Sequence, residues 1–243
     1  MPAPRPIYAG IRSSESPDRR DAMPSFPVAD ILTARKTTKV MFDPDNPAAP
    51  DTDRDTIESL IAVAGWAPFH KPAHRVHWRG TRTIEPWRFY LADARTCRRL
   101  IGFVLAGAEK PGRVPQMLAA AEALVLATWL PNPPEREGEG AGAAGSDGLF
   151  EPTMANMEHI AAASAAVQSF LLAATERGLT TYWSSGGYLR DAATFDHLGI
   201  PAEQILLGAV FVFPNDGGER ISGGLRDKRS ARAAWSRWVE PQD

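Results

Sequence analysis

The chain has 243 residues, of which 44% are hydrophobic and 23% are charged, and its formal net charge at pH 7 is −2. This composition can fill the core of one domain or of two small ones, which excludes an intrinsically disordered chain. The single cysteine, Cys97, excludes a disulfide-stapled fold. A nucleic-acid-binding protein usually has a basic excess, so the charge also argues against a nucleic-acid partner.

The amino-terminal residues indicate where the protein resides. They lack the continuous apolar stretch of a signal peptide, and no part of the chain approaches 18 uninterrupted apolar residues. We therefore expect a cytoplasmic protein that does not enter a membrane. Residues 1–27, rich in Pro, Ser and Arg, are expected to form an extended arm, and residues 28–243 a single domain.

The first half of this domain is predicted to begin with two helices. The first is expected over residues 29–35. The second is expected after Asp55-Thr56-Ile57-Glu58, which resembles a capping box. Apolar residues follow at the i, i+3, i+4 and i+7 spacing of an amphipathic helix, namely Ile57, Leu60, Ile61 and Ala64.

The remaining elements alternate between strands and helices. An aromatic strand, a helix and a buried strand are expected over residues 87–91, 94–106 and 123–130, with a chain break at Pro111-Gly112. Residues 131–149, rich in Pro and Gly, are expected to form a surface loop. After it come an apolar helix ending before Gly178 and two strands, over residues 154–177, 180–183 and 205–213. A single α/β or α+β domain fits this order.

No strong catalytic signature is present. The chain lacks a dinucleotide-binding glycine motif, a phosphate-binding P-loop and a nucleophile elbow. His70, His74 and His77 are spaced closely enough to suggest a metal site. However, Pro72 separates the first two, and no carboxylate or thiol is near, so we expect no metal.

Two basic clusters are the clearest candidates for a binding site. They are Arg35-Lys36-Thr37-Thr38-Lys39 and Arg226-Asp227-Lys228-Arg229. Arg and Lys provide charge-assisted hydrogen bonds and Thr a neutral donor, a combination that suits one phosphate group. Taken alone, each cluster is more often a solvated surface than a ligand site.

Five segments, in order, resemble the nitroreductase family of FMN-dependent oxidoreductases. They are Arg35-Lys36-Thr37, Gly65-Trp66-Ala67-Pro68, His70-Lys71, Glu85-Pro86-Trp87-Arg88-Phe89 and residues 178–186. Residues 195–201 and 205–214 also match the family's Leu-Gly-Ile-Pro segment and final hydrophobic strand. The resemblance covers residues 28–230. It implies an α+β fold with a central, mainly antiparallel sheet flanked by helices, in an intertwined homodimer with FMN at the subunit interface.

The resemblance also implies which residues bind the cofactor. Arg35, Lys36 and Thr37 would hold the FMN phosphate and ribityl chain, with Lys39 nearby. Arg226 and Lys228 would complete the phosphate clamp. The backbone N–H groups around Ser185 and Gly186 would approach flavin N5. The other implied FMN contacts are Pro68, His70, Lys71, Glu85, Trp183 and Ser184.

The function implied by the resemblance is reduction of electron-poor acceptors with NADH or NADPH. Nitroaromatics, quinones and activated alkenes are the implied substrate classes, reduced in a ping-pong cycle by hydride transfer through FMN. His70 is the one candidate for a catalytic side chain. Alternatives are an O₂-using or dehydrogenating flavoenzyme of the same fold, a flavin-binding or storage protein, and a nucleic-acid or anion-binding module. Insertions near residues 72–84 and 131–149 leave the substrate open.

Overall fold

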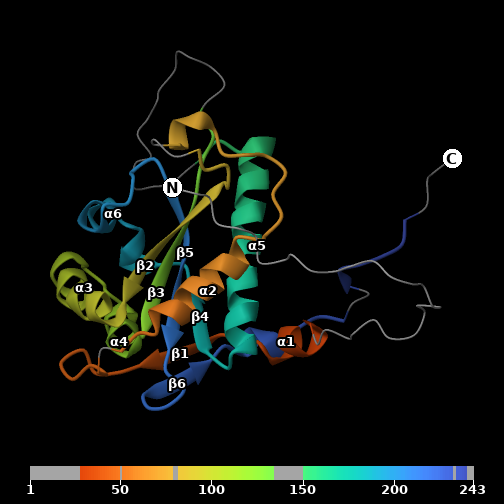
Figure 1. The fold of residues 1–243 in the computed structure, drawn as a ribbon. Helices are drawn as coiled ribbons and strands as arrows, with labels where there is room; N and C mark the ends of the chain where they lie inside the picture. Colours follow the sequence, from red (N-terminus) through yellow and green to blue (C-terminus); the bar gives the residue numbers. More distant parts are fainter. Residues whose placement is uncertain (1–27, 50, 79–81, 134–149, 232–233, 240–243) are drawn as a thin grey trace, which may run out of the picture.

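A computed structural model of the chain describes residues 28–49, 51–78, 82–133, 150–231 and 234–239 (Figure 1). The predicted arm over residues 1–27, and most of the predicted loop over residues 131–149, lie outside the described residues.

The centre of the fold is a four-stranded antiparallel sheet. Its strand order is β2-β3-β5-β4, formed by β2 (Trp87–Asp93), β3 (Ala123–Trp129), β5 (Ile205–Phe213) and β4 (Thr180–Ser184). Every residue of β3 is buried. A strand covered on both faces is a continuous apolar run, which is why β3 could be predicted from the sequence.

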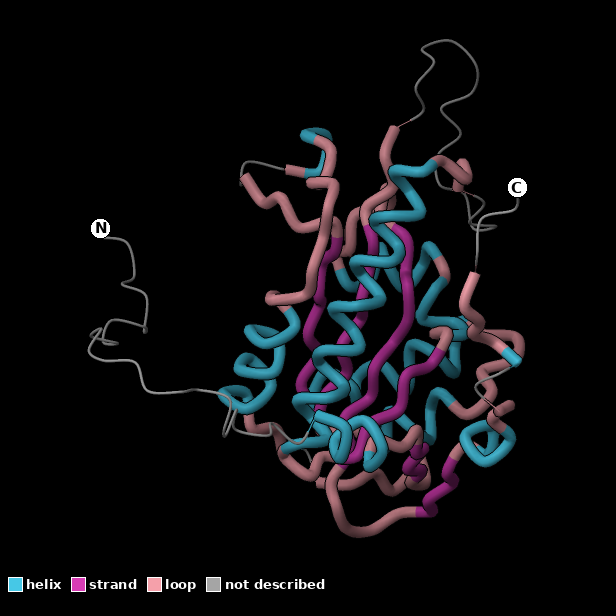
Figure 2. The backbone as a smooth tube through the Cα atoms, turned by 90° about the vertical axis from the view of Figure 1, so that its right-hand side faces the viewer, coloured by secondary structure: helices cyan, strands magenta, loops and turns pink. Residues whose placement is uncertain are grey.

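Helices cover both faces of this sheet (Figures 1 and 2). One face carries α3 (Ala94–Gly107), α4 (Val114–Ala120) and α6 (Ala192–Leu198); the other carries α2 (Arg54–Ala64) and α5 (Met154–Glu176). Alternate residues of β3 serve the two layers: Leu124 and Leu126 pack towards α3 and α4, while Val125 and Ala127 pack towards α2 and α5. The predicted α+β fold with an antiparallel central sheet is therefore confirmed.

The long helix α5 runs along the strands of the sheet (Figure 2). Phe170 and Leu171 are among its buried core residues, and Gly178, with a φ of 72°, lies just beyond its end. Among the described helices, α5 alone is long and apolar enough to cross a membrane. Half of its most apolar stretch is buried inside the fold, as in the core helix of a globular domain.

A second, two-stranded sheet joins the two ends of the described chain. In it β1 (Thr38–Met41) pairs antiparallel with β6 (Glu219–Ser222), so that Thr38 faces Ser222. The short helix α1 (Val28–Ala34) precedes β1, and the 3₁₀ turn η3 (Gly224–Lys228) follows β6. Neither strand is predicted from the sequence, because four residues are too few to show an alternating pattern.

The predicted capping box of α2 is wrong. The N-cap is Asp53, whose carboxylate accepts hydrogen bonds from the Thr56 backbone N–H (3.0 Å) and hydroxyl (2.7 Å). The predicted cap, Asp55, instead lies inside the first turn. Two short helices, α4 and α6, are also absent from the prediction. The first of these carries a proline in its first turn, a position where the missing N–H costs nothing.

The only cysteine is packed in the core. Cys97 on α3 is fully buried, and this burial raises the pKa of its thiol to about 12. The side chain is therefore a neutral, packed thiol.

A carboxylate at the start of α3 links that helix to α2. Asp93 is the N-cap of α3: it accepts a hydrogen bond from the Thr96 N–H (2.8 Å) and forms an ion pair with Arg54. The hydrogen bonds from Thr96, followed by the one from Arg54, lower the pKa of Asp93 to about 2.

We predict that Asp93→Ala lowers the free energy of unfolding by about 1 kcal/mol at pH 7. Because folding lowers the pKa of Asp93, its charge-dependent contribution is complete above about pH 4 and is lost as the pH falls towards 2. Urea unfolding at several pH values should therefore show a wild-type advantage that shrinks with acid. Asp93→Asn, which keeps a capping side chain, should cost less at pH 7. An advantage equal at pH 7 and at pH 2.5 would contradict this account.

Candidate functional site

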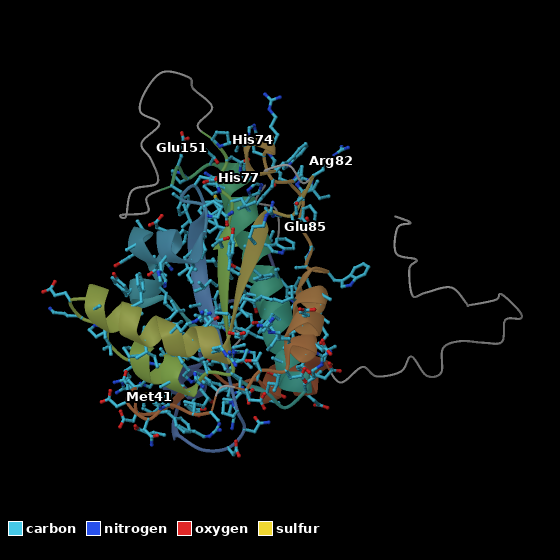
Figure 3. The ribbon with its side chains drawn as sticks, turned by 60° about the vertical axis from the view of Figure 1, so that its left-hand side comes forward. Met41, His74, His77, Arg82, Glu85 and Glu151 are labelled. Carbon is cyan, nitrogen blue, oxygen red and sulfur yellow. The ribbon has the colours of Figure 1, made fainter. Side chains whose placement is uncertain are left out.

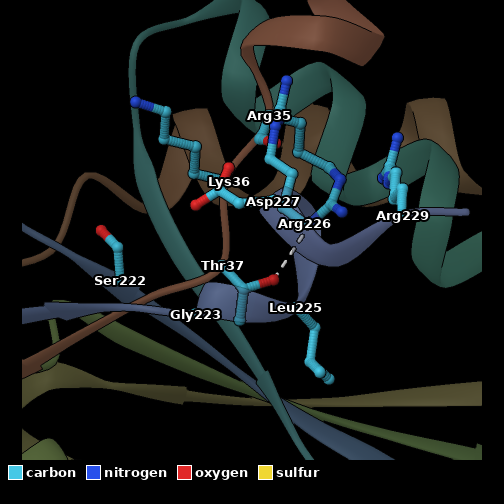
Figure 4. Close-up of a pocket in the computed structure, with 9 residues that line it drawn as sticks. All are labelled: Arg35, Lys36, Thr37, Ser222, Gly223, Leu225, Arg226, Asp227 and Arg229. Atoms are coloured by element: carbon cyan, nitrogen blue, oxygen red, sulfur yellow. Dashed lines mark hydrogen bonds between the residues drawn. The ribbon is translucent and has the colours of Figure 1, made fainter.

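A cavity of about 450 Å³ opens where the segment after α1 meets the segment after β6 (Figure 4). The β1–β6 pairing builds it, because the Gly223 N–H donates a hydrogen bond to the Thr37 carbonyl (2.9 Å) just beyond the paired strands. The lining residues are Arg35, Lys36, Thr37, Ser222, Gly223, Leu225, Arg226, Asp227 and Arg229.

The lining carries an excess of positive charge. Four of its side chains are cationic and one, Asp227, is anionic. The ion pairs among the described residues are Arg54–Asp93 and His70–Glu158, so none of them neutralises a cation of the cavity. Burial, followed by repulsion from Arg226 and Arg229, lowers the pKa of Arg35. An uncompensated group of cations in a cavity fits an anionic ligand such as a phosphate.

The structure brings together four of the predicted phosphate-binding residues and separates two others. Arg35, Lys36, Thr37 and Arg226 all line the cavity, and an Arg35 Nη donates a hydrogen bond to the Thr37 hydroxyl (3.4 Å). Lys228 is exposed and does not line it. Lys39 lies outside the lining on β1, its ammonium 4.9 Å from the ring centroid of Tyr182 on β4.

Five lining residues have no predicted role in FMN binding: Ser222, Gly223, Leu225, Asp227 and Arg229. Arg229 belongs to the basic run that contains Arg226, so its charge could have identified it. Ser222 and Gly223 carry no comparable signal, because they follow from a β1–β6 pairing that the sequence analysis does not predict.

The end of β4 forms a tight turn with constrained geometry. Gly186 has a φ of 109°, and a Cβ there would lie 2.6 Å from Leu206 Cδ2. Its N–H donates a hydrogen bond to the Ser184 hydroxyl (3.1 Å), while Arg190 donates to the Ser185 carbonyl (2.6 Å). Ser185 is an exposed residue, and its backbone N–H has no acceptor among the described residues. Of the two predicted amides, that of Ser185 is therefore the one without a hydrogen-bond partner among the described residues.

Trp183, the other predicted residue of this strand, packs on the sheet. Its indole covers Gly208 on β5, where an added Cβ would lie 2.1 Å from the Trp183 Nε1. Trp183 is partly buried against the core layer between the sheet and α5, so its side chain contributes to packing at the end of β4.

The other predicted residues lie between α2 and β2. Pro68, His70 and Lys71 are exposed, and Glu85 is half-buried. The His70 Nδ1 lies 3.5 Å from a carboxylate oxygen of Glu158 on α5. The second Glu158 oxygen is buried and has no hydrogen-bond partner in the described part of the chain.

The residues after α2 do not meet the cationic cavity within one chain. Figure 1 shows α1 and the cavity segments beside the carboxyl-terminal half of α5. His70, by contrast, contacts Glu158, which lies near the amino-terminal end of α5. With 23 residues, α5 is about 34 Å long. The loop and the cavity therefore lie beside different parts of this helix.

The three neighbouring histidines take separate roles. His77 is buried and its Nε2 lies 2.7 Å from the Pro131 carbonyl; burial lowers its pKa. The His74 Nδ1 accepts a hydrogen bond from the Val76 N–H (3.3 Å) at the start of a short 3₁₀ turn. Figure 3 shows this segment at the same end of the molecule as Glu85. Within the described residues, no three His, Cys, Asp or Glu side chains form a group suited to a metal ion.

Comparisons with solved structures and with protein families agree with this architecture. A nitroreductase-like family protein from Bacillus cereus is 20% identical, with a TM-score of 0.61, over 96% of this chain and 100% of that chain. A putative nitroreductase from Desulfovibrio desulfuricans, in complex with FMN, is 20% identical, with a TM-score of 0.52, over 89% and 98% of the two chains.

A nitroreductase with bound FMN from Bacteroides fragilis is 16% identical, with a TM-score of 0.50, over 88% and 98% of the two chains. At identities this low, the structural similarity establishes a shared fold and nothing more. No curated protein matches the sequence. The model of the nitroreductase family matches residues 32–212, most of the chain. The chain therefore belongs to the nitroreductase family.

Proposed function

We propose that this protein is an FMN-dependent oxidoreductase that takes electrons from NADH or NADPH. The observation that carries the proposal is the cavity formed by residues 35–37 and 222–229, whose cations have no carboxylate partner among the described residues. The solved nitroreductases from Desulfovibrio desulfuricans and Bacteroides fragilis contain FMN, which supports the same ligand here.

The residues of the cavity fit the phosphate of FMN. A phosphate monoester carries a charge of about −1.5 to −2 at pH 7 and offers three strong acceptor oxygens. Arg35 and Lys36 would supply opposite charge, and the Thr37 hydroxyl a neutral donor. The four cations of the lining, less its one carboxylate, carry more positive charge than one phosphate neutralises. They carry far less than a polyanion would need. A mononucleotide phosphate is therefore the best match.

The turn after β4 would serve the ring end of the cofactor. When bound, the flavin supplies the hydride-transfer chemistry that amino-acid side chains lack. The chain's contribution would be the Ser185 N–H, which is free to donate a hydrogen bond to a ring atom that gains negative charge. Gly186 keeps that amide approachable, because its positive φ turns the chain sharply with no side chain in the way.

We infer that the complete site needs two copies of the chain. The loop over residues 68–71 lies near one end of α5 and the cationic cavity near the other, so they would meet only across a homodimer. Large apolar side chains are exposed near the loop end of α5: Trp66 is 86% exposed, and Met154 and Met157 are more than half exposed. Exposed apolar side chains of this size are typical of subunit interfaces.

The first experiment is optical. We predict that the purified protein is yellow, or becomes so with added FMN, and that NADH or NADPH bleaches it anaerobically. Nitroaromatics, quinones or activated alkenes should then restore the colour. The complete absence of bound flavin after FMN addition would refute the proposal. Bound flavin that neither nucleotide bleaches would indicate a storage protein, and reoxidation only by O₂ an O₂-using enzyme.

A second prediction concerns the β4 turn. Gly186→Ala should cost about 1–3 kcal/mol of backbone strain and also weaken FMN binding, because the new Cβ would collide with Leu206. Gly199→Ala is the control: Gly199 also has a positive φ, 66° in the left-handed helical region, but nothing lies within 4 Å of an added Cβ. Flavin fluorescence and thermal melts compare the two. Equal FMN affinity in both variants would show that the turn does not contact the cofactor.

A further inference from the structure

The basic residues of the η3 segment are not equivalent. We propose that Arg229 binds the phosphate together with Arg35, that Arg226 is a positioning residue fastening η3 to α1, and that Lys228 takes no part. This assignment rests on the proposed FMN function and refines its anion site.

Arg226 is already engaged with the backbone of α1. Its guanidinium donates hydrogen bonds to the carbonyl oxygens of Thr33 and Arg35, at the carboxyl end of that helix. The last carbonyls of a helix have no partner within it and carry partial negative charge. Arg226 therefore neutralises a helix end that would otherwise repel an anion in the neighbouring cavity. It also joins two segments that lie 191 residues apart in the chain.

Arg229 is placed differently. It follows η3 directly and lines the cavity, and its guanidinium has no hydrogen-bond acceptor or carboxylate partner among the described residues. Arg35 lines the same cavity, and the positive charge of Arg229, after burial and Arg226, helps to lower the pKa of Arg35. A phosphate bound between them would replace this repulsion with two charge-assisted pairs.

The lining of the cavity separates Arg229 from Lys228. η3 ends at Lys228, and Arg229 follows it with an extended backbone (φ −65°, ψ 133°). Arg226 and Arg229 both line the cavity, whereas Lys228 does not. Figure 4 shows Arg229 and Lys36 on opposite sides of the cavity, with Arg35 and Arg226 between them.

The carboxylate of Asp227 makes this fourth cation necessary. It lines the same cavity and opposes the entry of an anion. With Arg226 committed to two carbonyls, Arg35 and Lys36 alone would face both this carboxylate and a phosphate of about two negative charges. Arg229 brings these charges into formal balance, on the side of the cavity away from Lys36.

The test compares the affinities of FMN and riboflavin, measured by flavin fluorescence in the full chain. Riboflavin lacks the phosphate, so the ratio of the two dissociation constants isolates the phosphate contacts. Arg229→Ala should weaken FMN about tenfold or more, as expected for loss of a hydrogen bond to a charged group, and leave riboflavin unchanged. Arg35→Ala should do the same. Lys228→Ala should stay within about twofold of the wild type for both ligands.

Two further variants control for charge and for folding. Lys110→Ala removes one exposed positive charge between α3 and α4, so its effect on FMN measures long-range electrostatics alone. Arg226→Ala should lower both the FMN affinity and the melting temperature of the flavin-free protein, because it unfastens η3 from α1. Arg229→Ala should not lower that melting temperature, since it removes a repulsion with Arg35.

Three results would overturn the assignment. One is a selective loss of FMN affinity in Lys228→Ala without a loss in Arg229→Ala. Another is an equal weakening of FMN and riboflavin by Arg229→Ala. The third is Arg226→Ala weakening FMN with no change in melting temperature. If the wild-type chain binds neither flavin, the proposed function is itself wrong and the assignment falls with it.

Discussion

The pairing of β1 with β6 is the constraint on which the cationic cavity depends. It holds Thr38 beside Ser222, 184 residues later in the chain, with their hydroxyl groups 3.2 Å apart. Each strand then leads directly into one wall of the cavity, formed by residues 35–37 or by residues 223–229. Because Arg226 also binds the carbonyls at the end of α1, the two walls are fastened both at the strands and at the helix.

This closure places like charges together at a cost to the folded state. Burial and the neighbouring guanidinium groups both lower the pKa of Arg35, and none of the ion pairs among the described residues relieves the repulsion. Clusters of this kind are typical of functional sites, where a ligand offsets the cost. The central sheet tolerates the strain because its own stability comes from apolar strands covered on both faces. Stability and binding are therefore located in different parts of the chain.

The sequence predicts the long elements well and the cavity only in part. β3, β5 and α5 are recognisable because continuous apolar runs mark them along the chain. β1 and β6 are not, since their pairing is fixed by partners far apart in sequence. The same limit explains why charge alone does not distinguish Arg229 from Lys228: only the folded cavity, whose lining includes Arg229 and not Lys228, separates them. The loop near His70 could be connected with FMN only through the family resemblance, because one chain keeps it far from the cavity.

The central claim is that this cavity holds the phosphate of FMN as a dianion between arginines. A ³¹P NMR titration of protein-bound FMN tests it directly. A free phosphate monoester takes up a proton near pH 6, with a change in its ³¹P shift. Opposite charges within a few ångströms favour the ionised form, so we predict that the bound phosphate keeps its dianion shift well below that pH. A bound phosphate that titrates like free FMN would contradict the account, because it would place the group in solvent and away from Arg35.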